Sequence, residues 1–158
     1  MMDPETKLTP HFTVREMCAS KSHPEIYNVP PLDVIDNMVY ICQILEMLRE
    51  EYSRIYAEGF PVLPLYINSG YRSKMLNKAV GGAATSAHLT GNAVDIRCKD
   101  CSQAIHYSAV LLSIFARLNV AWDEILIERK GLRFWVHFAA YPKNSKHDNR
   151  CKVSIISC

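Results

Sequence analysis

The sequence predicts an α+β domain in which helices flank a small, mostly antiparallel β-sheet. Three observations support this prediction. Two long segments carry apolar residues at helical spacing. Several short apolar segments have the length and the bounding turn residues of strands. The 158 residues, 49% of them hydrophobic and 22% charged, suit a single globular domain.

The N-terminal part is predicted to lead into a long helix within one domain over residues 1–158. Residues 1–31 are mixed and polar and are interrupted by prolines, so we expect an N-terminal anchoring segment there. Pro31 suits the start of a helix over residues 32–57, which Gly59 and Pro61 are expected to end. Its apolar residues recur every three or four positions: Leu32, Ile35, Val39, Cys42, Leu45, Leu48, Tyr52 and Ile55.

Shorter segments predict the strands and a second helix. Residues 62–68 have the pattern of a strand, and Pro64 favours a place at the edge of the sheet. Residues 124–128 and 133–138 flank a glycine-containing turn, which is typical of a hairpin. The other expected elements are a turn at 69–73, a short helix at 74–80, a loop at 81–86, a strand at 93–98, a helix at 102–118 and an edge strand at 153–156 within a polar C-terminal tail, 142–158.

Composition and missing motifs argue against several classes of protein. A formal net charge of +2 gives no electrostatic footprint for nucleic acid. No apolar run reaches the roughly 18–20 residues that cross a bilayer. The sequence has no GxSxG motif, no P-loop and no GxGxxG after a predicted strand. Residues 1–7 lack the basic and apolar regions of a signal peptide, so the chain is expected to be cytoplasmic as synthesised.

The six cysteines are expected to be thiols in a reducing compartment. Cys98 and Cys101 form a CxxC motif, to which Cys151 and Cys158 could add two further ligands of a structural zinc site. These spacings fit no standard zinc pattern, so free or loosely paired cysteines are the preferred interpretation. Disulfides would be the alternative for a chain that had lost a leader.

A histidine and an aspartate close in sequence are the first sign of chemistry. His88 lies in a glycine-bearing loop, and Asp95 follows seven residues later between Val94 and Ile96, in a predicted strand. Burying a lone carboxylate costs several kcal/mol unless a cation or hydrogen bonds compensate. A metal ion would compensate it, and pairing with Arg72 or Arg97 is the alternative.

His137 is the second polar residue in an apolar strand. Alternation places it on one strand face with Trp135 and Ala139. Two imidazoles and one carboxylate on neighbouring elements would make a three-ligand zinc site that leaves a position open for water, as catalytic zinc sites do. A histidine that is simply hydrogen-bonded within the core is the alternative.

Four sequence elements resemble a known family. The pattern Ser86-x-His88-x-x-Gly91-x-Ala93-x-Asp95 resembles the SxHxxGxAxD signature of the zinc D-alanyl-D-alanine carboxypeptidase and L,D-endopeptidase family. The segments 69–73 (SGYRS), 76–82 (LNKAVGG) and 135–137 (WVH) resemble further elements of that family, in the same order. The resemblance covers residues 12–141 and implies a fold distantly related to the hedgehog signalling domain.

The resemblance implies a role for each matching residue. One zinc ion would be held by His88, Asp95 and His137. Arg72 would hold the substrate carbonyl or carboxylate and the oxyanion, because guanidinium stays charged and donates two parallel hydrogen bonds; an ordinary surface arginine is the alternative. Ser86 would line the site or orient a ligand, or it would only cap the loop.

Aromatic residues near these motifs are further candidates for substrate contact. Tyr66, Tyr71, Trp122 and Trp135 could line a substrate groove, and of these Tyr71 and Trp135 are the predicted substrate-binding residues. Packing in the core is the commoner fate of such side chains.

The general base is predicted to be Glu128, with Glu124 in reserve. Several family members carry a glutamate three residues before the last histidine, where this chain has Phe134. In the branch that this chain resembles, a glutamate ends the preceding strand instead, at the place of Glu128. A two-residue turn at Lys130-Gly131 would put Glu124 opposite His137, and a wider loop would bring Glu128 nearer the metal. Either glutamate could instead pair with a nearby cation.

The resemblance implies a zinc metallopeptidase that hydrolyses peptidoglycan stem peptides, as a D-Ala-D-Ala carboxypeptidase or a cell-wall endopeptidase. A phage endolysin released by lysis fits a chain without a leader. Two alternatives stay open: a cytoplasmic D-Ala-D-Ala dipeptidase and a non-catalytic zinc-containing binding module. The chain is expected to be a monomer that contacts neither nucleic acid nor membrane.

Overall fold

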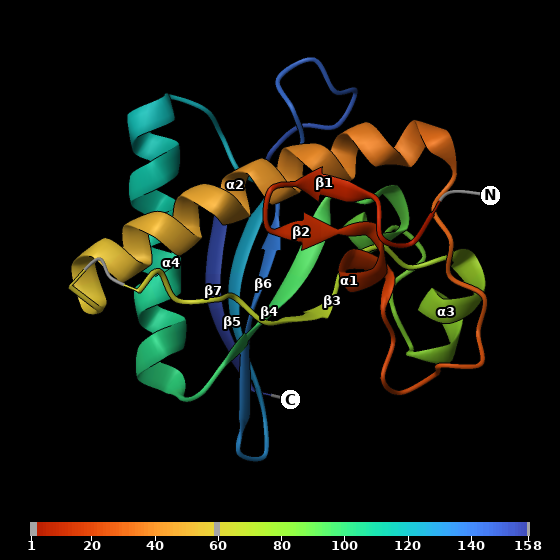
Figure 1. Cartoon of the computed structure of the whole chain (residues 1–158), viewed down its shortest axis with the longest axis horizontal. Helices are drawn as coiled ribbons and strands as arrows, with labels where there is room; N and C mark the ends of the chain where they lie inside the picture. The colour runs from red at the N-terminus through yellow and green to blue at the C-terminus, as the bar shows by residue number, and fades with distance from the viewer. Residues whose placement is uncertain (1–2, 59–60, 158) are drawn as a thin grey trace.

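The computed structural model describes residues 3–58 and 61–157 and confirms the α+β class (Figure 1). A main sheet of five strands has the order β3-β4-β6-β5-β7, and a separate two-stranded sheet pairs β1 with β2. The strands are β1 (Lys7–Thr9), β2 (Phe12–Thr13), β3 (Ile67–Ser69), β4 (Ala93–Cys98), β5 (Glu124–Lys130), β6 (Arg133–Ala139) and β7 (Lys152–Ser157). The helices are α1 (Val14–Cys18), α2 (Leu32–Tyr56), α3 (Lys74–Ala79), the 3-10 helix η1 (Ala87–Thr90) and α4 (Cys101–Leu118).

The two faces of the main sheet have different roles. One face contributes Val94, Ile96, Val136 and Phe138 to the hydrophobic core, where they join buried residues of α2 and α4. Figure 1 shows α2 crossing this face, with α4 beside it and the β1–β2 hairpin packed on α2. Because side chains alternate along a strand, the polar residues between these core positions point to the opposite face.

Apolar periodicity produces both long helices as predicted. In α2, residues such as Met38, Ile41 and Leu45 are fully buried at spacings of three and four. Helix α4 begins at Cys101, where the Asp100 side chain accepts a hydrogen bond from the Gln103 amide at 2.8 Å. Burial of these two helix faces supplies most of the core beneath the sheet.

The β5–β6 hairpin turns one residue later than expected, at Gly131-Leu132. Lys130 pairs with Arg133, so Glu124 lies opposite Ala139 and Leu126 lies opposite His137. The two-residue turn at Lys130-Gly131, which would have put Glu124 opposite His137, therefore does not form. The register differs by two residues, and because the strand period is two, every side chain keeps its predicted face.

Two predicted strands differ in extent or direction. The strand expected over 62–68 is limited to Ile67–Ser69, at an edge of the sheet. Pro61 and Pro64 precede it and cannot donate ladder hydrogen bonds. The expected last strand forms as β7, the opposite edge, and it runs parallel to β5. No helix among the described residues is long and apolar enough to span a bilayer.

Candidate metal centre

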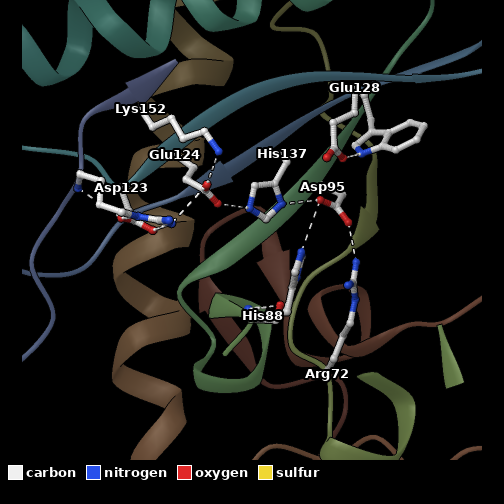
Figure 2. A network of polar contacts seen from close by, with 11 residues as sticks. Arg72, His88, Asp95, Asp123, Glu124, Glu128, His137 and Lys152 are labelled. Carbon is white, nitrogen blue, oxygen red and sulfur yellow. Dashed lines mark hydrogen bonds and ion pairs between the residues drawn. The ribbon is translucent and has the colours of Figure 1, made fainter. Parts of the chain in front are cut away.

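His88, Asp95 and His137 converge on the polar face of the sheet (Figure 2). One ligand atom from each lies within 4.8 Å of the other two. Asp95 Oδ1 is central, at 3.4 Å from His88 Nε2 and 2.9 Å from His137 Nδ1. Ligands of a tetrahedral zinc at ~2.0–2.2 Å are themselves roughly 3.3 Å apart, and both distances from Asp95 Oδ1 are close to this spacing. Within the described part of the chain, this is the one cluster in which three His, Cys, Asp or Glu side chains lie close enough together to share a metal ion.

The position of His88 is fixed by η1, in which it lies, and by the backbone carbonyl of Gly70. The η1 helix is followed by its cap residue Gly91, with a φ of +72°. A Cβ at Gly91 would lie 2.7 Å from Val34 Cγ1, so glycine fits both the left-handed backbone and the close approach to α2. His88 Nδ1 lies 2.6 Å from the Gly70 carbonyl oxygen. Since a carbonyl only accepts, Nδ1 carries the proton and Nε2 faces Asp95 as a free ligand atom.

Asp95 is buried, with 8% of its surface exposed, between two fully buried core residues. Backbone pairing puts it opposite His137 on β6 and next to Ser69 on β3. Burial alone would raise the pKa of its carboxyl, but the charges and hydrogen bonds of His88 and His137 hold that pKa well below its usual range. The carboxylate is therefore ionised and available as a ligand.

His137 lies between two carboxylates. Its Nδ1 is 2.9 Å from Asp95 Oδ1, and its Nε2 is 3.6 Å from Glu124 Oε2. Burial lowers the pKa of His137, but the hydrogen bond to Asp95 and the ion pair with Glu124 outweigh this effect and raise it to about 9. The ring thus carries a proton between Asp95 and Glu124 when no metal is bound, and a metal would have to displace it.

Arg72 borders the donor set on the other side of Asp95. Its Nη2 donates to Asp95 Oδ2 at 2.6 Å, and its Nε donates to Ser69 Oγ at 2.8 Å. Of the two arginines that could pair with Asp95, the structure therefore selects Arg72. Arg97 instead donates from Nε to Asn68 Oδ1 at 3.3 Å. Among the described residues, Nη1 of Arg72 has no hydrogen-bond acceptor and remains free for a ligand.

Leu126 of β5 lies opposite His137, and the two glutamates of β5 lie two residues before and two residues after Leu126. They therefore flank His137. In Figure 2 they lie on opposite sides of the His137 ring, with Glu128 on the side of Asp95. Glu128 accepts a hydrogen bond from Trp135 Nε1, its own partner across the sheet. In the described part of the chain it makes no ion pair with Lys or Arg.

Glu124, by contrast, lies in a network of cations that the sequence did not reveal. Arg150 Nη2 and Lys152 Nζ each lie 3.2 Å from Glu124 Oε1. The contact with His137, and then those cations, lower the pKa of Glu124 to about 2. Arg150 also donates to both carboxylate oxygens of buried Asp123, at 2.7 Å each. No local signal could have revealed this network, because Arg150 is 26 positions from Glu124 and lies in a segment predicted only as a polar tail.

A cavity of about 570 Å³ opens over the donor set. Its lining includes the three donor residues together with Arg72, Ser86, Glu124, Glu128 and Arg150. Ser86 both lines the cavity and caps η1, since its Oγ accepts from the His88 amide at 3.4 Å. An open, polar cavity of this size can admit a peptide backbone to the donor set.

The two aromatic residues predicted to contact substrate lie in different places. Trp135 lines a second cavity next to Arg72. Tyr71 is 7% exposed, belongs to the hydrophobic core and lines neither of these two cavities. Its backbone amide donates a 2.8 Å hydrogen bond to the Met17 carbonyl of α1, which ties this segment to the N-terminal part of the chain.

The cysteines form no second metal site among the described residues. Cys98 is buried and Cys101 and Cys151 are exposed, and all three are free. The fourth cysteine of the expected zinc knot, Cys158, lies outside the described residues. Burial raises the pKa of the Cys98 thiol to about 12, so it is not a ready thiolate ligand.

Comparison with known proteins adds one finding. A family model described as Peptidase M15 matches residues 10–111, which include Arg72, His88 and Asp95. No curated protein matches the chain significantly. The matched segment ends before His137, so the third donor is brought to the site by the part of the sheet that follows it.

Proposed function

Because this chain belongs to the peptidase M15 family and is thereby a zinc-dependent peptidase, we propose that it hydrolyses one bond of peptidoglycan stem peptides, either the terminal D-Ala-D-Ala bond or a cross-link. The observation that carries the proposal is the convergence of His88, Asp95 and His137 on one point at the base of an open cavity. Two imidazoles and one carboxylate with an open side are the ligand set of a hydrolytic zinc.

The proposed ligand atoms are His88 Nε2, Asp95 Oδ1 and His137 Nδ1. The remaining ring nitrogens support this choice, since His88 Nδ1 donates to the Gly70 carbonyl and His137 Nε2 faces Glu124. Outer partners of this kind fix the tautomer and the ring orientation of metal-binding histidines. Bound zinc would act as a Lewis acid on the scissile carbonyl and would favour loss of a proton from water.

We assign the general base to Glu128. It lines the cavity, lies on the Asp95 side of His137 and makes no ion pair with Lys or Arg within the described residues. Glu124 is a poor candidate because its contacts lower its pKa to about 2, far below the range of an effective base at neutral pH. Trp135 Nε1 orients the Glu128 carboxylate through a hydrogen bond.

Glu128 would transfer the proton of the attacking water, and Arg72 would stabilise the charge that develops on the carbonyl oxygen. Glu128 takes a proton from the attacking water as the new C–O bond forms. Arg72 donates from its free Nη1 to the carbonyl oxygen, which gains negative charge at that step. Glu128 returns the proton to the amine nitrogen as the C–N bond breaks, leaving one carboxylate and one amine.

Digestion of purified peptidoglycan tests the proposal. The zinc-loaded chain should release fragments whose masses, measured on separated muropeptides, identify the bond that is cut. A chelator should stop release and added zinc should restore it, while His88→Ala should stay inactive. Free D-Ala-D-Ala assayed in parallel separates a dipeptidase from a wall enzyme. Binding to the wall without any cleaved product would support a non-catalytic binding module instead.

A further inference from the structure

A second cavity, of about 550 Å³, adjoins the metal centre and has a different character. Arg72 and Asp95 line both cavities, so the two meet at this ion pair. The lining of the second cavity includes residues of the hairpin end of the sheet and of the segment between α1 and α2. Five of its lining residues are cationic and only Asp95 is acidic: Lys21, Arg72, Arg97, Lys130 and Arg133.

Most of this positive charge is not neutralised within the chain. Arg72 alone of the five has a carboxylate partner, Asp95. Within the part of the chain that the structure describes, Lys21, Arg97, Lys130 and Arg133 make no ion pair. The network at the opposite end of the site differs, because there Asp123 and Glu124 already neutralise Arg150 and Lys152. The excess positive charge is therefore on the Arg72 side.

Strand geometry places this charge at a short distance from the reaction. Arg97 lies two residues after Asp95 on β4, on the same face and opposite Trp135 of β6. Two residues of a strand span roughly 6.6 Å. Arg133 lies on the same β6 face, two residues before Trp135. A group held by Arg97 and Arg133 would thus lie one or two peptide residues away from the bond at the metal centre.

Apolar side chains complete the second cavity. Leu76, Val80, Leu132, Phe134 and Trp135 contribute to its lining. Two of them are unusually exposed for their type, Leu132 at 91% and Val80 at 40% of their surface. A ligand with a carboxylate on a short aliphatic stem would place its charge between the arginines and its stem on this apolar surface.

We propose that this cavity is a substrate subsite that takes a carboxylate of the peptide, one or two residues from the scissile bond. The inference rests on the proposed peptidase function, and it adds that acidic peptides are preferred over their neutral counterparts. The guanidinium groups suit this role because they stay charged and match the two oxygens of a carboxylate.

Two peptides that differ in one charge test the subsite by binding alone. The zinc-loaded chain is titrated with N-acetyl-Ala-Glu-amide and with N-acetyl-Ala-Gln-amide at constant ionic strength, and the chemical shifts of its backbone amides are followed by NMR. The acidic peptide should bind about tenfold more tightly, since a few partly exposed ion pairs with its carboxylate add only modest affinity. The largest shifts should fall on Arg97, Arg133 and Trp135.

Variants identify the residues responsible. In the double variant Arg97→Gln with Arg133→Gln, the ratio of the two affinities should fall to about one. Arg54→Gln is the matched control, because it removes a cation from α2 whose partner is Glu51. That control should keep the tenfold ratio. An equal affinity of both peptides for the wild-type chain, or a ratio that survives the double variant, would overturn the proposal.

The same pair of peptides separates this inference from the proposed function. If the acidic peptide binds as expected but no wall peptide is ever cleaved, the carboxylate site stands and the proposed peptidoglycan substrate is wrong. If wall peptides are cleaved but charge makes no difference to binding, the peptidase assignment stands and the subsite is wrong. Inorganic phosphate, added as a competitor, should displace the acidic peptide only weakly, because it lacks the apolar stem.

Discussion

Glu124 Oε2 lies 3.6 Å from His137 Nε2, on the side of the ring opposite Asp95 (Figure 2). The imidazole is therefore held between one carboxylate that belongs to the donor set and one that does not. Arg150 and Lys152 hold the outer carboxylate in place, and both come from the segment that ends in β7. The C-terminal edge of the sheet thus orients a residue at its centre.

Replacing Glu124 should weaken zinc binding more than it impairs chemistry. In Glu124→Gln the charge facing His137 Nε2 is lost, and outer partners of metal-binding histidines typically contribute 10–100-fold in affinity. We expect the dissociation constant for zinc, measured by competition with a chromogenic chelator, to rise roughly tenfold. Turnover should largely recover when zinc is saturating.

Replacing Glu128 should have the opposite effect. Glu128→Gln keeps its place beside Trp135 but cannot accept the proton from water, so turnover should fall by roughly 10²–10⁴-fold while zinc content stays near one per chain. Metal content and rate are measured on the same samples. If Glu124→Gln loses turnover at saturating zinc and Glu128→Gln does not, the base has been misassigned.

His88 should be required for the metal. The His88→Ala chain loses a buried donor held by Gly70, so purified protein should contain well below one zinc where the wild type holds about one. Elemental analysis gives the ratio, and circular dichroism shows whether the variant is folded. His88→Gln, which is closer in volume, serves if the alanine variant unfolds. Full zinc content and activity in a folded variant would refute the ligand assignment.

The metal-free chain should lose stability as the pH rises from about 6.5 to about 9. His137 has a pKa of about 9 in the folded chain against 6.5 as its ordinary value. The folded state therefore binds the proton more tightly, and this contribution is complete below pH 6.5 and lost as the pH rises through about 9. A raised pKa of more than one unit corresponds to more than ~1 kcal/mol, or several degrees in melting temperature.

Thermal melts with a chelator, at pH 6.5, 7.5 and 9, measure this effect. The His137→Asn variant should show a smaller decline over that range, because it has no imidazole to titrate. The zinc-loaded wild type should also decline less, since the metal replaces the proton between the carboxylates. A metal-free wild type whose melting temperature rises between pH 6.5 and 9 would contradict the structure of this pair.

Local pattern was enough to predict most elements of the fold. Strand β4 has the predicted bounds, Ala93–Cys98, and α2 and α4 agree with the prediction to within one residue at each end. These elements are set by periodic burial, which is visible in the order of residues. The Asp95 carboxylate was conspicuous for the same reason, as a charge where the pattern required an apolar side chain.

Pairing between distant segments could not be predicted in the same way. The hairpin register differs from the expected one by two residues, because both alternatives leave the same side chains on each face and the turn alone decides between them. The parallel direction of β7 depends on its pairing with β5, a strand far away in sequence. The cations around Glu124 depend on that same β7 pairing.

The sequence by itself determined the composition of the centre: which two imidazoles and which carboxylate are candidates, and that each lies in or beside an apolar strand that forces compensation. Only the tertiary structure decided how the surrounding charges are shared. In the folded chain Arg72 pairs with Asp95, and Arg150 and Lys152 pair with Glu124. Among the described residues, Glu128 has no cationic partner, and neither Arg97 nor Arg133 has an acidic one. The reason is physical: burial follows from local alternation, whereas an ion pair depends on a separation of a few ångströms between groups that only the folded sheet brings together.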